Sequence, residues 1–495
     1  MNRNKQINSE AMKKVLARPE DNRIIRLAVL PLLCFLFAVT GTLTAQTGLY
    51  TRAPDVIPGT TPEMRTPEYW IHSLENAEEV VMAPAQILEM NRRYQQRVLD
   101  IQESDSDTGN RVRQQLSGTP GLYAYRPGIH ALSPGELAET IREMVDGQIG
   151  VLRRRSYANL LGVEYAGHEL EALENEMSRN AIPDEIHLKP GITVADTRIR
   201  IIPALRPEYV GLMQTGKTRW DVWNLDVLPI ASPVQVLHIS GSGAHLFVFS
   251  DYGFGWVPSE QIAFASQADI DAISGSDRFV VSTGDRVPIY SGTDYNVVSG
   301  WMRMGSRLPV SGSGSELTVT VPVRQINGGL EMQSGWLRPD AEVHIGPLPY
   351  TRENVIRLGF RMLDNLYDWT GGWYGRNDGT VLRDIFKTFG FEIPANGVLL
   401  SIFSENNRVS PADAGREERY QEMTESDPFT TFMASRSGHS LLYMGELDGV
   451  PVVFDTHGYG YEENGEEIEV RRWSVATLSL PDYLLRQDVT ITDIR

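Results

Sequence analysis

Thiols and imidazoles are the side chains with the widest range of chemistry in proteins, and this sequence is poor in thiols. Its 495 residues include one cysteine, Cys34, and nine histidines. A single thiol permits no intramolecular disulfide and no zinc or iron–sulfur site built from several cysteines. The histidines also lack the HExxH spacing of a zinc hydrolase. The sequence therefore indicates neither a resident metal nor a cofactor.

The overall charge narrows the class of partner. Against 46 Lys and Arg residues stand 64 Asp and Glu residues, which gives a formal net charge of -18. Such a chain repels phosphate backbones, so nucleic acid is excluded as the main partner. The apolar content of 41% and the charged content of 22% are ordinary for globular proteins. The length predicts several domains.

The first 45 residues have the pattern of an export signal. Residues 1–26 carry seven cations and three anions, and an apolar run over 27–39 and a stretch of mostly small residues over 40–45 follow. Either the segment is cleaved near Ala45, or residues 27–45 stay as a membrane anchor. Both alternatives place the remainder in the periplasm or cell envelope, and this segment is the only membrane contact we expect.

The elements that follow predict an N-terminal helical domain. Closely spaced prolines over 46–66 are typical of an extended tether. Within a domain over 67–190, residues 84–101 place apolar side chains at helical spacing. A second helix begins at Ser133, where Pro134 and Glu136 complete a capping box. We expect these two helices to pack on each other.

The middle of the chain predicts two small antiparallel barrels. Short runs of β-forming residues are broken every several residues by Gly, Pro, Ser and Asp. The first unit covers 191–265 and the second 266–345. Each carries a Gly-Trp-aliphatic step near its end, as Gly255-Trp256-Val257 and Gly335-Trp336-Leu337. This similarity indicates a divergent repeat.

Residues 346–495 predict an α+β domain. Thr351 can cap one helix, and a second helix is expected over 379–389. Strands over 440–444 and 450–454 flank Asp448-Gly449, a strong hairpin turn, and further strands are expected over 469–473 and 489–492. The fold class is therefore multidomain α+β, with helices, two barrels and a C-terminal helix–sheet domain.

Three segments of this last region resemble the NlpC/P60 peptidases. They read GPLPYTRENVIRLGFRMLDNLYDWTGG over 346–372, RNDGTVLRDIFKTFG over 376–390 and SGHSLLYMGELDGVPVVF over 437–454. The barrels resemble the paired bacterial SH3 domains of the multidomain branch of that family, and residues 69–100, with VVMAPAQILEMNRR, resemble its N-terminal clip domain. The resemblance implies a papain-like α+β C-terminal domain and follows the same domain order throughout.

The resemblance also implies an activity and a set of site residues. Such proteins act on peptidoglycan stem peptides as γ-D-glutamyl-diamino-acid endopeptidases, with a Cys, a His and a third polar residue. The family's Arg-Asp-Cys-Ser corresponds here to residues 376–379, so Asp378 occupies the nucleophile position. His439 occupies the position of the general base. The third position falls on Asp455 without a gap, or on His457 after a slip of two residues.

A carboxylate at the nucleophile position changes the chemistry. It attacks amides poorly, and its acyl adduct would be a strained anhydride, so cysteine-type turnover should be absent. Three alternatives remain open: a pseudoenzyme that binds stem peptides, a hydrolase in which His439 and Asp378 activate water, and a scaffold that docks another envelope protein. In the purely structural interpretation, Asp378 is an ordinary N-cap worth about 1 kcal/mol to its helix.

Aromatic residues next to the expected cleft are candidate ligand contacts. Trp369, Trp373 and Tyr374 surround a glycine-rich turn, and aromatic walls commonly hold ligands. Plain packing is the structural alternative for all three. We include Arg376 in the same candidate binding set.

Overall fold

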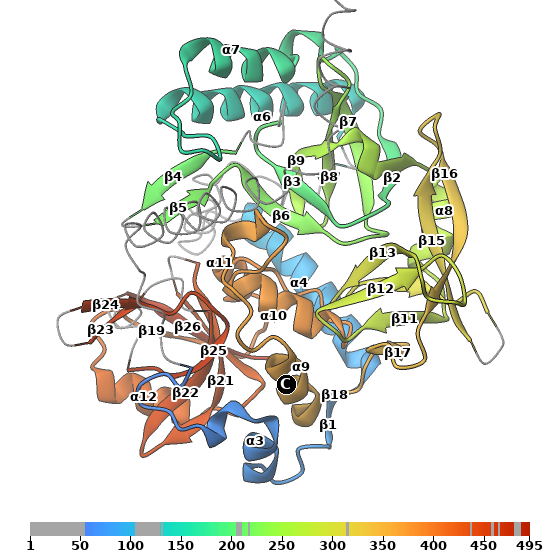
Figure 1. Ribbon diagram of the computed structural model, residues 1–495. Coiled ribbons are helices and arrows are strands. Elements are labelled where there is room, and N and C mark those ends of the chain that lie inside the picture. The colour runs from blue at the N-terminus through green and yellow to red at the C-terminus, as the bar shows by residue number, and fades with distance from the viewer. Residues whose placement is uncertain are drawn as a thin grey trace, which may run out of the picture. The chain divides into compact units, whose positions relative to one another are not determined.

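The computed structural model describes residues 55–103, 129, 132–203, 210–215, 218–312, 316–435, 438–456, 460–463, 466–479 and 487–495. Residues 53–495 form one compact unit (Figure 1). The expected signal or anchor over 1–45, with the apolar segment 27–45, lies outside the described residues. Among the helices that are described, none is both long and apolar enough to cross a bilayer.

Residues 55–66, expected to be an extended tether, are folded onto the C-terminal part of the chain. Ile57 is buried against Ile468 and Val470, and Met64 is buried in the largest apolar cluster. Arg65 also pairs with Asp364 at 2.7 Å. Two well-placed apolar side chains therefore outweigh the extended preference of the surrounding prolines.

The first helices belong to the same C-terminal core. Helix α3 (Pro67–Ser73) and helix α4 (Pro84–Glu103) place Trp70, Ile87 and Tyr94 in the cluster that holds Phe386 of the C-terminal domain. Strand β1 (Val80–Met82) pairs antiparallel with β18 (Tyr350–Thr351). This segment is thus an N-terminal extension of the C-terminal domain.

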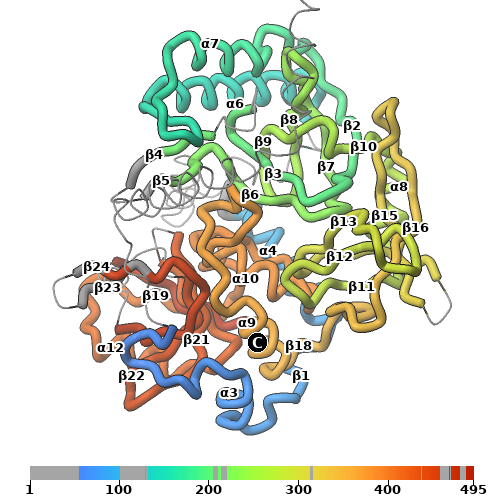
Figure 2. Tube along the Cα trace, viewed as in Figure 1, coloured from blue at the N-terminus to red at the C-terminus, as the bar shows by residue number. Residues whose placement is uncertain are grey.

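The next helices pack elsewhere, which corrects the expected helix pairing. Helix α6 (Pro134–Arg154) begins with the predicted capping box of Ser133 and Glu136, and α7 (Gly167–Glu176) follows it. Their buried side chains share a cluster with Trp223 and Trp256 of the first sheet region. Figure 2 traces α6 and α7 next to that sheet. The apolar face of α4 was predicted correctly, but its partner was not.

Two groups of antiparallel strands fill the middle of the chain. The first is a sheet in the order β10-β2-β7-β8-β9-β3-β6 beside a separate β4–β5 hairpin, and the second combines sheets in the orders β14-β11-β17 and β13-β12-β16-β15. Helix α8 (Gln267–Ser274) lies between them in sequence. The strands of the first group are β2 (Lys189–Thr193), β3 (Thr197–Arg200), β4 (Leu212–Thr215), β5 (Thr218–Asp221), β6 (Asn224–Leu228), β7 (Pro233–Ile239), β8 (His245–Ser250), β9 (Gly253–Pro258) and β10 (Ile262–Phe264). Those of the second are β11 (Phe279–Ser282), β12 (Arg286–Tyr290), β13 (Val298–Arg303), β14 (Arg307–Pro309), β15 (Leu317–Arg324), β16 (Leu330–Leu337) and β17 (Val343–Ile345). Their likeness to SH3 barrels stays a prediction.

The C-terminal domain packs helices on an antiparallel sheet in the order β19-β26-β20-β21-β22-β25. Helix α10 (Asp378–Lys387) buries Leu382, Ile385 and Phe386. The ring centroid of Phe386 lies 4.9 Å from that of Phe432 on β20. The predicted hairpin is confirmed as β21 (Ser440–Leu447) and β22 (Val450–Asp455). The strand expected over 469–473 is displaced, because one strand ends at Glu469 and the next begins at Ser474. The other elements are α9 (Arg352–Arg361), α11 (Gly397–Leu400), α12 (Arg416–Thr424), β19 (Asn407–Ser410), β20 (Thr431–Ser435), β23 (Gly460–Glu463), β24 (Glu466–Glu469), β25 (Ser474–Thr477) and β26 (Val489–Asp493).

Candidate functional site

The N-terminus of α10 is capped by Asn377 and not by Asp378. The Asn377 side chain accepts from the backbone N–H of Thr380 at 2.9 Å, and the Thr380 hydroxyl accepts from the Asn377 N–H at 2.8 Å. This reciprocal pair satisfies the first turn of the helix. The interpretation of Asp378 as a plain N-cap is therefore wrong, and its carboxylate is available for another contact.

The Asp378 carboxylate lies against the start of β21. Its Oδ2 is 3.0 Å from Nδ1 of His439 and accepts from the backbone N–H of Ser440 at 2.7 Å. A tight turn holds His439 in place, because Ser435 accepts from the His439 N–H through Oγ and donates its own N–H to the His439 carbonyl. Helix α10 and the turn before strand β21 thus bring together two residues that are 61 positions apart in sequence.

Asp455 completes the group from the end of β22. Its Oδ1 is 2.9 Å from Nε2 of His439, and the residue is fully buried. The ungapped alternative for the third position therefore lies beside the imidazole, while His457 lies outside the described residues. We call Asp378, His439 and Asp455 the carboxylate–imidazole triad.

The triad favours the protonated form of the imidazole. Burial of the ring lowers the pKa of His439, but the carboxylates of Asp455 and Asp378 raise it by a larger amount. The pKa is therefore well above its usual value. Each ring nitrogen donates to a carboxylate only when both are protonated. Both ring nitrogens lie within 3.0 Å of a carboxylate oxygen, an arrangement that favours an imidazolium over a neutral imidazole.

This arrangement predicts a pH-dependent stability. Because the pKa of His439 is higher in the folded protein than its value of about 6.5 in the unfolded chain, its stabilising contribution is complete below pH 6.5 and is lost as pH rises towards the folded pKa. The free energy of unfolding should fall above pH 6.5 by up to about 1.4 kcal/mol per pH unit. Urea denaturation of the wild type and His439→Gln between pH 6 and 9 measures it. A difference between the two proteins that does not change with pH would contradict the imidazolium assignment.

Two glycines allow a neighbouring segment to approach the triad closely. A side chain at Gly379 would collide with the carbonyl of Ala395, and one at Gly397 would lie 2.6 Å from the carbonyl of Gly438. The segment 395–397 therefore packs against the residue after Asp378 and against the turn before His439. In the resemblance, Gly379 stands where the family has serine, so this contact depends on a second departure from the family pattern.

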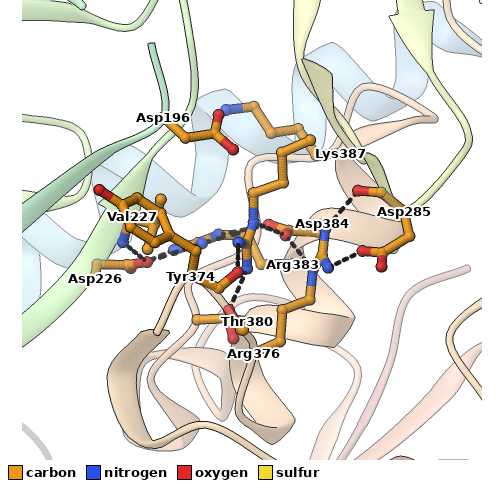
Figure 3. A network of polar contacts seen from close by, with 12 residues as sticks. Asp196, Asp226, Val227, Asp285, Tyr374, Arg376, Thr380, Arg383, Asp384 and Lys387 are labelled. Carbon is orange, nitrogen blue, oxygen red and sulfur yellow. Dashed lines mark hydrogen bonds and ion pairs between the residues drawn. The ribbon is translucent and has the colours of Figure 1, made fainter. Parts of the chain in front are cut away.

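Arg376 is removed from the candidate binding set, because its guanidinium is buried and engaged. Its Nε donates to Asp384 at 2.7 Å and its Nη1 pairs with Asp285. Asp384 also accepts from Arg303 at 2.6 Å and pairs with Arg383 at 3.3 Å. Figure 3 shows this buried network around Asp384 on α10. Sequence analysis missed it, since its members come from separate segments.

The three aromatic candidates lie on the turn before α10. Trp369 is 37% exposed, Trp373 is 59% exposed, and Tyr374 is partly buried. The guanidinium carbon of Arg198 lies over the Tyr374 ring, 5.3 Å from its centroid. Sequence analysis missed Trp220, whose ring lies 6.1 Å from that of Trp369. Within the described ranges, no group of three or more His, Cys, Asp and Glu side chains is arranged to hold a metal ion.

Comparison with known proteins identifies solved structures that share this fold. No protein-family model and no curated protein matches the chain. The solved NlpC/P60 endopeptidase from Photobacterium damselae subsp. piscicida is 18% identical with a TM-score of 0.66, and the match covers 86% of this chain and 96% of that one. An NlpC/P60 family protein from Bacillus cereus is 16% identical with a TM-score of 0.40, over 61% of this chain and 98% of that one. Over most of its length, this chain therefore has the fold of an NlpC/P60 endopeptidase.

Proposed function

We propose that this protein is an exported cell-envelope pseudoenzyme that binds peptidoglycan stem peptides without cleaving them. The fold it shares with an NlpC/P60 endopeptidase supports the ligand class. One observation carries the loss of activity: both nitrogens of His439 lie within 3.0 Å of a carboxylate oxygen, on Asp378 and Asp455.

Peptide cleavage by the family's mechanism needs an activated nucleophile. The Asp378 carboxylate already accepts from the imidazolium and from the Ser440 N–H, and both contacts lower the electron density available for attack. Attack on an amide would also have to expel an amine and leave an anhydride. These features favour a binding role.

The water-activating alternative fits the same geometry less well. A general base must have a free lone pair within reach of the water it deprotonates. The two nitrogens of His439 face Asp378 and Asp455, and the raised pKa of His439 favours the form in which both are protonated. Water activation would require one of these ion pairs to break first.

A docking scaffold is a second candidate function, supported by exposed apolar side chains on and next to β13. Val297, Val298 and Trp301 are 60%, 42% and 41% exposed, and β13 lies at the end of its sheet. Clustered exposed apolar side chains are typical of protein interaction sites. The partner in this case would be another envelope protein.

Calorimetry and mass spectrometry with one ligand separate these functions. The probe is the sugar-free tripeptide L-Ala-γ-D-Glu-diaminopimelate, added to the purified full-length chain and to its His439→Ala variant. We expect both proteins to bind the tripeptide and neither to release a product. Product formed by the wild type and abolished in His439→Ala would establish the altered hydrolase instead. Absence of binding would contradict the pseudoenzyme and leave the scaffold.

A further inference from the structure

The turn that precedes α10 contains strained backbone at two residues with side chains. Thr370 has φ 53° and Tyr374 has φ 64°, both in the left-handed region. Such residues cost roughly 1–3 kcal/mol each and cluster at functional sites. The turn persists because Asp368 Oδ2 accepts from the backbone N–H groups of Trp373 at 2.7 Å and Gly375 at 2.8 Å.

The same turn is fastened to the first group of strands. The Thr370 hydroxyl donates to the carbonyl of Asn224 at 2.9 Å, and the Asn224 amide donates to the Thr370 carbonyl. Arg198 donates to the carbonyl of Gly372 at 2.9 Å. The backbone is thus held rigidly from outside the C-terminal domain.

This rigid turn presents indole rings to solvent. Trp369 and Trp373 are 37% and 59% exposed. The ring centroid of Trp220 on β5 lies 6.1 Å from that of Trp369, with 36° between the ring planes. The guanidinium carbon of Arg471 lies over the Trp220 ring, 5.6 Å from its centroid. We call Trp220, Trp369 and Trp373 the aromatic platform. The indole surface of Trp369 and Trp373 that the fold leaves uncovered is available to a ligand, and covering it would be favourable.

The chemistry of the platform selects its ligand. Pyranose rings present C–H groups with partial positive charge, which fit the negative face of an indole. Cations lie over the rings of Tyr374 and Trp220, whereas Trp369 and Trp373 have exposed ring surface. The net charge of -18 disfavours polyanionic saccharides. A neutral sugar polymer satisfies both conditions.

We propose that the aromatic platform binds the neutral amino-sugar chain of peptidoglycan. This inference rests on the proposed function, since it adds the glycan to the stem peptide as a second part of one ligand. The glycan would stack on Trp369 and Trp373, whose positions are fixed by the strained turn.

Two probes separate this inference from the proposed function. They are the peptide-free β-1,4-linked N-acetylglucosamine tetramer and the sugar-free stem tripeptide, each titrated by calorimetry into the full-length chain. We expect Trp369→Ala and Trp373→Ala each to weaken tetramer binding about tenfold and to weaken tripeptide binding by a clearly smaller factor. Trp369→Phe, which keeps an aromatic face, should recover most of the loss and shows that the turn still folds.

Tyr69→Ala is the matched control. Tyr69 is 37% exposed, as Trp369 is, but it lies on α3 and belongs to no proposed binding surface. If Tyr69→Ala weakens tetramer binding as much as Trp373→Ala does, the inference is overturned. Tripeptide binding without tetramer binding would also overturn it and leave the proposed function intact. A third result is also informative. If the wild type binds the tetramer but not the tripeptide, and only the platform variants weaken tetramer binding, the platform is supported and the stem-peptide function is refuted.

Discussion

Asp384→Ala should destabilise the protein by about 3–5 kcal/mol, the cost of leaving buried charges unpaired. Asp384 Oδ2 accepts from Nε of Arg303 at 2.6 Å and of Arg376 at 2.7 Å, and the carboxylate is 1% exposed. Burial raises the pKa of Asp384, but Arg303 and Arg376 lower it by a larger amount. The net pKa is below its usual value, so the carboxylate stays charged. Its removal leaves neighbouring buried guanidinium groups without their shared counter-charge.

Urea denaturation measures this loss, and a surface pair provides the control. Asp340 pairs with Arg338 at 3.1 Å, and both side chains are more than half exposed. Asp340→Ala should leave the denaturation midpoint unchanged, because exposed pairs contribute little. Asp384→Asn keeps the shape while removing the charge and should lose nearly as much as Asp384→Ala. A midpoint for Asp384→Ala equal to that of Asp340→Ala would refute the role of the network.

The network also connects the site helix to both groups of strands. Arg383 of α10 pairs with Asp226 of β6 at 3.0 Å, and Arg303 of β13 donates to the carbonyl groups of Tyr374 and Gly375. Arg303 therefore holds both the turn that carries Trp369 and Trp373 and, through Asp384, the helix that carries Asp378. Buried pairs are screened little by salt, so this connection should persist at high ionic strength.

Local sequence signals predicted the elements well, and contacts between distant elements poorly. The capping box of Ser133 and the Asp448-Gly449 turn are confirmed, because both depend on residues within a few positions. The apolar face of α4 also exists, but periodicity does not specify a partner, and Tyr94 packs in the C-terminal core. The cap of α10 was misplaced by one residue, because Asn377 and Asp378 are both good N-caps.

The candidate site was predicted through family resemblance and not through spacing. Asp378 begins a helix, His439 lies in the turn before β21 and Asp455 ends β22, and no local pattern connects them. The Asp384 network could not be predicted at all, because its arginines and carboxylates resemble ordinary surface charges until the fold buries them. Burial and pairing are properties of the three-dimensional arrangement, and a charged residue in sequence carries neither.

Asp378→Cys should create a strongly acidified thiol. The substitution is made with Cys34→Ser, so that the introduced thiol is the only one in the chain. At the N-terminus of α10 and beside the His439 imidazolium, its thiolate gains the contacts now made by Asp378 Oδ2 at 3.0 Å to His439 and at 2.7 Å to the Ser440 N–H. Cysteines in such positions titrate one to several pH units below the ordinary value of about 8.5.

The rate of iodoacetamide alkylation against pH measures that acidity. Adding His439→Gln removes the imidazolium and should return the thiol towards ordinary acidity, which separates the effect of the ring from that of the helix. An unshifted alkylation profile in the Asp378→Cys protein would contradict the contact between residue 378 and His439. If the thiol is acidic and the sugar-free tripeptide is now cleaved, the loss of activity resides in one side chain. An acidic thiol without cleavage would show that the missing thiol alone does not explain the lack of activity, and Gly379→Ser, at the residue that packs against Ala395, would be the next substitution to test.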